Sequence, residues 1–196
     1  MSQEIEIEFK NMLTKEEFET LIEHFQIEES QFHIQHNHYF DTVDQQLRQL
    51  KSGLRIRQLE NYNELTLKEP ARGIALTETT DRLSDEQVQS ILIEGTPIPA
   101  LEVADRLHAF EVSLNELQRI GTLSTTRAEI NYNGGLLVFD HSLYADQEDY
   151  ELEYEVVDEE EGKMIFLALL NELAIPVRPA QKKLARFMKA LKRLEE

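Results

Sequence analysis

Two segments near opposite ends of the chain carry rows of glutamates at the spacing of a β-strand. In EIEIEFK (4–10), the glutamates and Lys10 alternate with apolar residues, so they share one face of the expected strand. In YELEYEV (150–156), three more glutamates share a face. Either these faces meet water, as polar strand faces usually do, or the carboxylates hold metal cations and Lys10 holds an anion.

Basic residues occupy other expected strands at the same spacing. Arg55 and Arg57 share one face of the segment LRIR, opposite an apolar face. Lys68 and Arg127 also lie on polar faces of their strands. Guanidinium and ammonium groups in such rows suit phosphate oxygens, although pairs of charges on a solvated surface would give the same pattern.

Strands and helices alternate irregularly along the chain. Hydrophobic periodicity and turn residues predict strands over 4–10, 31–41, 53–59, 63–69, 74–82, 122–132, 136–144 and 150–156. Capping residues and helical periodicity predict helices over 14–25, 84–92, 99–108, 159–174 and 180–194. This mixture indicates the α+β class, with mostly antiparallel strands.

The apolar strand faces and the amphipathic helices need to cover one another. We therefore expect a closed, mostly antiparallel eight-stranded β-barrel with the helices packed outside and the charged rows facing inward. A barrel of about eight strands has room for one small ligand. No linker or low-complexity segment interrupts residues 1–196, so we expect a single domain.

Composition excludes several classes of protein. The net charge of −18 argues against a partner such as nucleic acid or an anionic membrane surface. No apolar run approaches the length of a membrane span, and no signal peptide is evident, so we expect a cytoplasmic protein. Cysteine is absent, which excludes disulfides and thiolate metal sites.

The charged rows also resemble a known family. The segment Glu6-Ile7-Glu8-Phe9-Lys10 resembles the ExExK signature of the CYTH domain, also called the triphosphate tunnel metalloenzymes. The segments YFDT (39–42), LRIR (54–57), LTLK (65–68) and TR (126–127) resemble further motifs of that family in the same order. Glu4 permits a competing register, but only Glu6 and Glu8 place Lys10 at the fifth position of the signature.

The resemblance implies roles for individual residues. The implied ligands of Mg²⁺ or Mn²⁺ are Glu6, Glu8, Asp140, Glu153 and Glu155, and a register that uses Glu151 with Glu153 stays open. The implied phosphate ligands are Lys10, Arg55, Arg57, Lys68, Arg127 and one of Lys182 and Lys183.

The activity that the resemblance implies is metal-dependent hydrolysis of a small-molecule triphosphate. The absence of tryptophan, which could stack on a base or thiazolium ring, favours inorganic triphosphate over thiamine or nucleoside triphosphates. Lys10 with Tyr39 is the candidate pair for proton transfer. The alternatives are an adenylyl cyclase of the same family, a polyphosphate or nucleotide sensor without turnover, and an acidic domain that binds a protein partner. The sequence does not indicate an oligomeric state.

Overall fold

The structure is a computed structural model that describes residues 3–98 and 102–195. The strands of these residues are β1 (Gln3–Leu13), β2 (His33–Thr42), β3 (Gly53–Gln58), β4 (Asn63–Pro70), β5 (Leu76–Leu83), β6 (Leu117–Tyr132), β7 (Gly135–Tyr144) and β8 (Gln147–Val156). The α-helices are α1 (Lys15–His24), α2 (Gln46–Gln49), α3 (Asp85–Gln89), α4 (Glu102–Ala109), α5 (Glu159–Glu172) and α6 (Lys183–Glu195). The first residues of the helix predicted over 99–108 lie outside the described residues.

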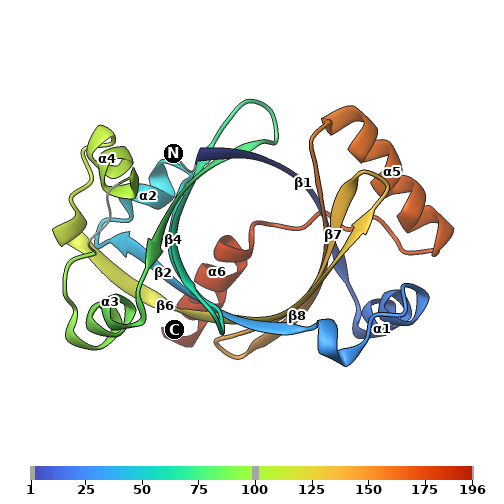
Figure 1. Cartoon of the computed structure of the whole chain (residues 1–196), viewed down its shortest axis with the longest axis horizontal. Helices are drawn as coiled ribbons and strands as arrows, with labels where there is room; N and C mark the ends of the chain where they lie inside the picture. Colours follow the sequence, from blue (N-terminus) through green and yellow to red (C-terminus); the bar gives the residue numbers. More distant parts are fainter. Residues whose placement is uncertain (1–2, 99–101, 196) are drawn as a thin grey trace. The chain divides into compact units, whose positions relative to one another are not determined.

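The strands close into a barrel in the order β1-β5-β4-β3-β2-β6-β7-β8 (Figure 1). The ladders β1–β8, β2–β3, β3–β4, β4–β5, β6–β7 and β7–β8 are antiparallel. The predicted eight-stranded closed barrel is therefore confirmed. The chain divides into two compact units, a first unit of residues 1–5 and 35–122 and a second unit of residues 6–34 and 123–196.

In the first unit, helices cover the apolar faces of β3 and β4. The fully buried residues of this core include Leu54, Ile56, Leu65 and Leu67 from the strands, with Val103 and Leu107 from α4. The Asp81 carboxylate fixes the start of α4, because it accepts hydrogen bonds from the backbone N–H groups of Glu102 (3.3 Å) and Val103 (2.9 Å). This packing leaves the opposite face of β3 to its arginines.

In the second unit, α1 and α5 cover the apolar face of β7 and β8 (Figure 1). The buried core includes Leu137, Phe139, Leu152 and Tyr154 from the strands, Phe18 and Leu21 from α1, and Phe166 and Leu169 from α5. The predicted capping box begins α1, with Glu17 N–H donating to Thr14 Oγ1 (3.2 Å) and Thr14 N–H donating to Glu17 Oε2 (2.8 Å). The charged face of β8 is thereby turned away from these two helices.

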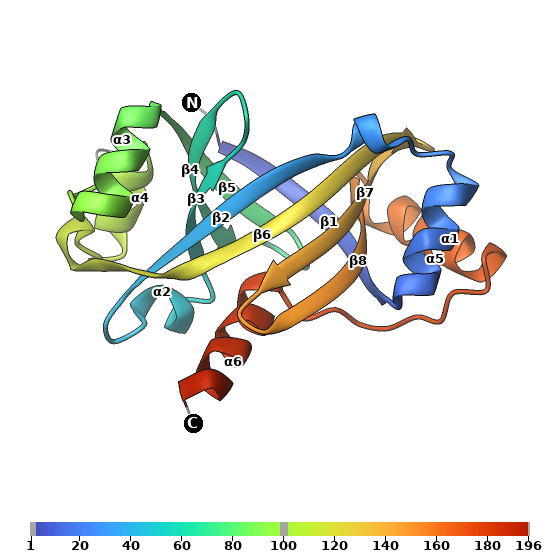
Figure 2. The same cartoon turned by 90° about the horizontal axis from the view of Figure 1, so that it is seen from below.

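Helix α6 differs from α1 and α5, because it lies on the charged face of β7 and β8. It runs beside the turn between these strands (Figure 2), where Arg193 Nη2 lies 3.5 Å from Asp146 Oδ2. Phe187 packs edge-on against Tyr144, with ring centroids 6.0 Å apart. The expectation of helices on the apolar strand faces thus describes α1 and α5 but not α6.

Local backbone chemistry explains the hairpin that joins β6 to β7. Asn133 and Gly134 both have positive φ (42° and 83°), as the two central residues of a type I′ turn require. Gly135 follows because a Cβ there would lie 2.6 Å from the backbone oxygen of Glu155. This close approach seats β7 against β8.

Two further elements differ from the sequence prediction. Helix α2 was not predicted, since it has four residues and its N–H groups are held by a side chain: the Asp41 carboxylate accepts from Leu47 (2.9 Å) and Arg48 (3.1 Å). Strand β6 begins at Leu117, before the predicted residue 122.

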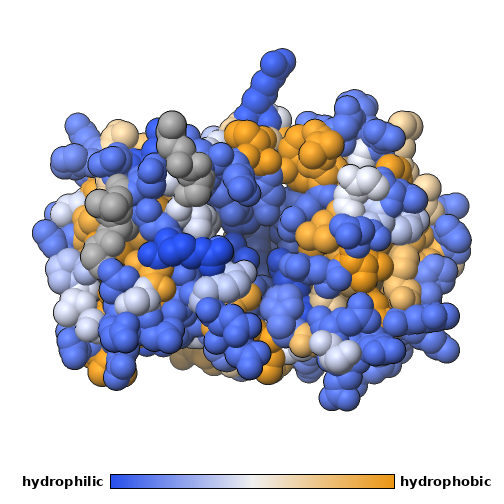
Figure 3. All heavy atoms as spheres, viewed as in Figure 1, coloured by the Kyte–Doolittle hydropathy of each residue, from blue (hydrophilic) through white to orange (hydrophobic). Residues whose placement is uncertain are grey.

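No helix within the described ranges is both long and apolar enough to cross a bilayer. The face shown in Figure 3 is mostly hydrophilic, in keeping with the net charge of −18.

Candidate metal and phosphate site

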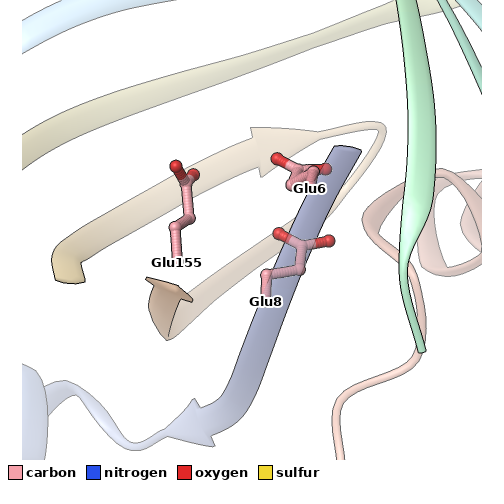
Figure 4. A group of neighbouring side chains, drawn as sticks. All are labelled: Glu6, Glu8 and Glu155. Atoms are coloured by element: carbon pink, nitrogen blue, oxygen red, sulfur yellow. The ribbon is translucent and has the colours of Figure 1, made fainter. Parts of the chain in front are cut away.

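Three carboxylates meet on one face of the β1–β8 ladder. Glu6, Glu8 and Glu155 each offer one oxygen, and these oxygens all lie within 4.8 Å of one another (Figure 4). A set of carboxylate oxygens at this spacing can hold a hard divalent cation such as Mg²⁺ or Mn²⁺. We call these residues the carboxylate trio.

The register of the strands explains how the carboxylate trio forms. Glu8 lies directly opposite Glu155 in the antiparallel ladder, and Glu6 is two residues from Glu8 and therefore on the same face. Phe9 points to the other face and stacks on Phe166 of α5, with ring centroids 6.1 Å apart. A shift of one residue would bury the glutamates under α5, so packing fixes the register.

Lys10 connects the carboxylate trio to a second group of charges on the same face. Its Nζ lies 2.9 Å from Glu8 Oε2 and donates a 2.6 Å hydrogen bond to Glu153 Oε1. Glu151 Oε1 lies 3.6 Å from the same Nζ. Lys10 thus bridges the trio and the next two glutamates of β8.

The second group is centred on Arg127 of β6 and Asp140 of β7. Arg127 donates from Nε (2.7 Å) and Nη2 (2.6 Å) to the two oxygens of Asp140, which is the bidentate geometry of a strong guanidinium–carboxylate pair. Its Nη2 also donates to Glu153 Oε2 at 3.0 Å. The Asp140 side chain is fully buried, so this pair is shielded from water.

Helix α6 completes the group with Lys183. Its Nζ donates to Asp140 Oδ2 and, at 3.2 Å, to Glu153 Oε1, and it lies 3.7 Å from Glu151 Oε1. We call Lys10, Arg127, Lys183, Asp140, Glu151 and Glu153 the ion network. Three cations in one buried cluster can bind an anion with several oxygens, provided that the carboxylates release them.

The ion network shifts the pKa values of its members. Burial alone would raise the pKa of Glu153, but Lys10, Lys183 and Arg127 outweigh it and hold that pKa well below its usual value. Burial opposes the charged form of Lys10, yet Glu153, Glu8 and Glu151 hold its pKa well above the usual value. For Glu151, burial wins over the attraction of Lys183 and raises the pKa to about 7.

The predicted phosphate ligands of the first unit share one strand face. Arg55 and Arg57 lie opposite Tyr39 and Asn37 in the β2–β3 ladder, and Arg57 Nε donates to Asn37 Oδ1 at 3.2 Å. Lys68 forms an ion pair with Glu78 across β4 and β5. Buried Tyr39 therefore shares the polar face with the arginines, as its position in β2 predicted.

Comparison with known proteins identifies the family. The CYTH domain model matches residues 4–188, which includes the carboxylate trio and the ion network. The chain belongs to the CYTH domain family.

Two similar proteins match this chain in sequence, and one of them also in fold. A Bacillus subtilis (strain 168) protein named "Putative triphosphatase YjbK" is 44% identical over 187 residues, which are 95% of this chain and 96% of that protein. A Bacillus halodurans crystal structure described as "a putative adenylate cyclase" is 42% identical, with a TM-score of 0.90 over 95% of this chain and 99% of that one.

A more distant solved structure supports the fold alone. The Hippeastrum protein HpAC1, described as a "putative adenylyl cyclase" that "reveals a dominant triphophatase activity", is 22% identical and has a TM-score of 0.81. The alignment covers 94% of this chain and 95% of that chain.

The structure sorts the predicted CYTH metal ligands into two groups. Glu6, Glu8 and Glu155 meet in the carboxylate trio. Asp140 and Glu153 contact the cations of the ion network instead. Of the two late lysines, Lys183 enters the network while Lys182 is exposed and its carbonyl begins α6 by accepting the N–H of Ala185 (2.8 Å).

Sequence reasoning missed one partly buried cation of α6. Arg186 contacts Asp149 and Glu151 of β8, and its side chain is 12% exposed. Its spacing from Lys183 was an available signal, because residues three apart on a helix share a face.

Proposed function

We propose that this protein hydrolyses the terminal phosphoanhydride bond of a triphosphate, most readily inorganic triphosphate, with the help of Mg²⁺ or Mn²⁺. The observation that carries the proposal is one strand face in the second unit with a carboxylate trio beside buried cations, joined by Lys10. A metal–triphosphate complex has both kinds of charge that such a face can bind. The name of the Bacillus subtilis relative supports the same activity.

The donor set fits the metal that the family implies. Glu6, Glu8 and Glu155 would hold the ion through carboxylate oxygens, which Mg²⁺ and Mn²⁺ prefer over nitrogen or sulfur. When bound, such an ion neutralises phosphate charge and polarises the oxygens around the phosphorus. Asp140 and Glu153 stay proposed metal ligands, but their ion pairs with the cations of the ion network would have to break first.

The cations of the chain bind and orient the phosphates. Lys10, Arg127 and Lys183 would exchange their carboxylate partners for phosphate oxygens, and Arg55, Arg57 and Lys68 stay proposed ligands from the first unit. In the reaction, a water oxygen bonds to the terminal phosphorus while the bond to the bridging oxygen breaks, giving orthophosphate and diphosphate. Fixed guanidinium and ammonium groups stabilise the charge that this transfer spreads over the phosphate oxygens.

Lys10 suits phosphate binding better than proton abstraction. Its raised pKa keeps the amine protonated among Glu153, Glu8 and Glu151, so it donates hydrogen bonds rather than accepting a proton. The pairing of Lys10 with Tyr39 in proton transfer stays a prediction.

An adenylyl cyclase is the second candidate, because the Bacillus halodurans relative is described as one. One assay separates the candidates: the protein is incubated with inorganic, thiamine or nucleoside triphosphate, with and without Mg²⁺ or Mn²⁺, and the products are measured. We expect metal-dependent release of orthophosphate, fastest from inorganic triphosphate. Cyclic AMP and diphosphate from ATP would instead establish the cyclase, and tight binding without any product would establish a sensor.

A further inference from the structure

Helix α6 carries a second partly buried cation, Arg186, on the face that bears Lys183. Arg186 Nε donates a 2.9 Å hydrogen bond to Asp149 Oδ2, and its Nη2 lies 2.5 Å from Glu151 Oε2. Tyr144 steadies Asp149 from β7, with its hydroxyl donating to Asp149 Oδ2 at 2.5 Å. Arg186 is thus fixed between two carboxylates of β8.

Glu151 forms ion pairs with two cations of the ion network, Lys10 and Lys183, and with Arg186. Its side chain is fully buried, and in the described part of the chain neither of its oxygens is engaged in a hydrogen bond. Three ion pairs compensate it: Arg186 at 2.5 Å, Lys10 at 3.6 Å and Lys183 at 3.7 Å. Arg186 is the nearest of the three.

We propose that Arg186 is a positioning residue that neutralises Glu151 and thereby keeps Lys10 and Lys183 available to an incoming phosphate chain. This inference rests on the proposed function, because it concerns the binding of that substrate. A buried carboxylate that loses its nearest cation is strongly destabilised unless another cation replaces it. Lysine side chains are flexible, and both ammonium groups need to move only slightly to contact Glu151.

The proposal differs from a purely structural role of Arg186 in holding α6 on β8. If Arg186 only anchored the helix, removing the charge of Glu151 would remove a second anchor and worsen the defect. If Arg186 shields the lysines from Glu151, removing that charge relieves the defect. The single variant Glu151→Gln should then weaken the attraction that holds Lys10 and Lys183 in place even while Arg186 is present, although both lysines keep their closer contacts with Glu153.

The test measures binding of imidotriphosphate, in which NH groups replace the bridging oxygens, by calorimetry with Mg²⁺ at pH 8.5. We expect Arg186→Ala to raise the Kd roughly tenfold, the equivalent of one weakened contact to a charged group. Glu151→Gln should lower the Kd, and Arg186→Ala combined with Glu151→Gln should return it close to the wild-type value. In the hydrolysis of inorganic triphosphate, these variants should change KM in the same direction as the Kd, and should change kcat less.

Arg193→Ala is the matched control, because Arg193 lies on the same helix and pairs with Asp146 while 57% of its side chain is exposed. We expect it to leave the Kd unchanged. A double variant that binds more weakly than Arg186→Ala would overturn the proposal, as would a Glu151→Gln variant that loses affinity. The result for Glu151→Gln decides the question even if Arg186→Ala does not fold. A wild-type protein that neither binds imidotriphosphate nor hydrolyses triphosphate would overturn the proposed function and this inference with it.

Discussion

Replacing Arg127 by alanine should destabilise the second unit by about 3 kcal/mol. Arg127 makes two hydrogen bonds to Asp140, which is fully buried, and one to Glu153. Removing one partner of a buried ion pair typically costs about 3–5 kcal/mol, because the remaining charge stays buried without compensation. The lower end applies here, since Lys183 still contacts both carboxylates.

The assay is urea-induced unfolding followed by circular dichroism, with thermal unfolding beside it. For a protein of this size, about 3 kcal/mol corresponds to a fall in Tm of roughly 6–12 °C. Lys15→Ala is the control, because its ion pair with Glu19 spans 3.8 Å on the exposed side of α1. Such a surface pair contributes at most about 1 kcal/mol.

Two results would refute this reasoning. One is a loss of stability for Arg127→Ala no larger than that for Lys15→Ala. The other concerns the double variant Arg127→Met with Asp140→Leu, which replaces the pair by apolar groups and should recover much of the stability. A double variant less stable than Arg127→Ala would show that the cost does not come from an uncompensated charge.

Three further predictions follow from the charged faces and the buried polar groups. Arg57→Ala should weaken the binding of triphosphate by roughly 10- to 150-fold and the binding of orthophosphate much less. Arg82→Ala, at an exposed arginine, is the control. Equal losses of affinity for both ligands in calorimetry would count against Arg57 as a ligand of the phosphate chain. Inorganic triphosphate with Mg²⁺ should raise the Tm of the wild type by several degrees, since a ligand at a hundredfold excess over Kd adds about 2.7 kcal/mol to the free energy of unfolding. Glu6→Gln should lose most of this shift, and an equal shift in both proteins would exclude Glu6 as a metal ligand. Burial lowers the pKa of His38, so on acidification the unfolded chain binds the proton before the folded chain does, and stability falls as the pH drops below about 6.5 towards the lowered pKa. His38→Gln should flatten this part of the pH–stability curve, and an unchanged slope would show that His38 does not cause the fall.

The sequence predicted most of the secondary structure because the signals were local. The Thr14–Glu17 capping box and the Asn133-Gly134 turn act within four residues, so their chemistry is readable without tertiary contacts. Helix α2 was missed for the opposite reason, since its N–H groups are held by Asp41, which precedes it by several residues.

Strand geometry made one part of the candidate site predictable, namely which side chains share a strand face. Alternation placed Glu6 and Glu8 on one face of the first strand and Glu155 on the glutamate face of the last, and the structure shows that Glu155 lies opposite Glu8. Alternation could not tell that Glu153 would contact Lys10, Arg127 and Lys183. That outcome depends on α6 lying on the charged strand face, and the amphipathic pattern of α6 predicted only that one of its faces would be covered.

The central claim is that the carboxylate trio supports metal-dependent hydrolysis of a triphosphate, and the most direct measurement is orthophosphate release from inorganic triphosphate as Mg²⁺ is titrated. The comparison is between the wild type, Glu8→Gln and Glu4→Gln, because Glu4 belongs to the same row of β1 but is exposed and not part of the trio. We predict Mg²⁺-dependent release by the wild type and by Glu4→Gln, and none by Glu8→Gln although it stays folded. Equal, Mg²⁺-dependent release by all three proteins, or no release by the wild type, would contradict the claim.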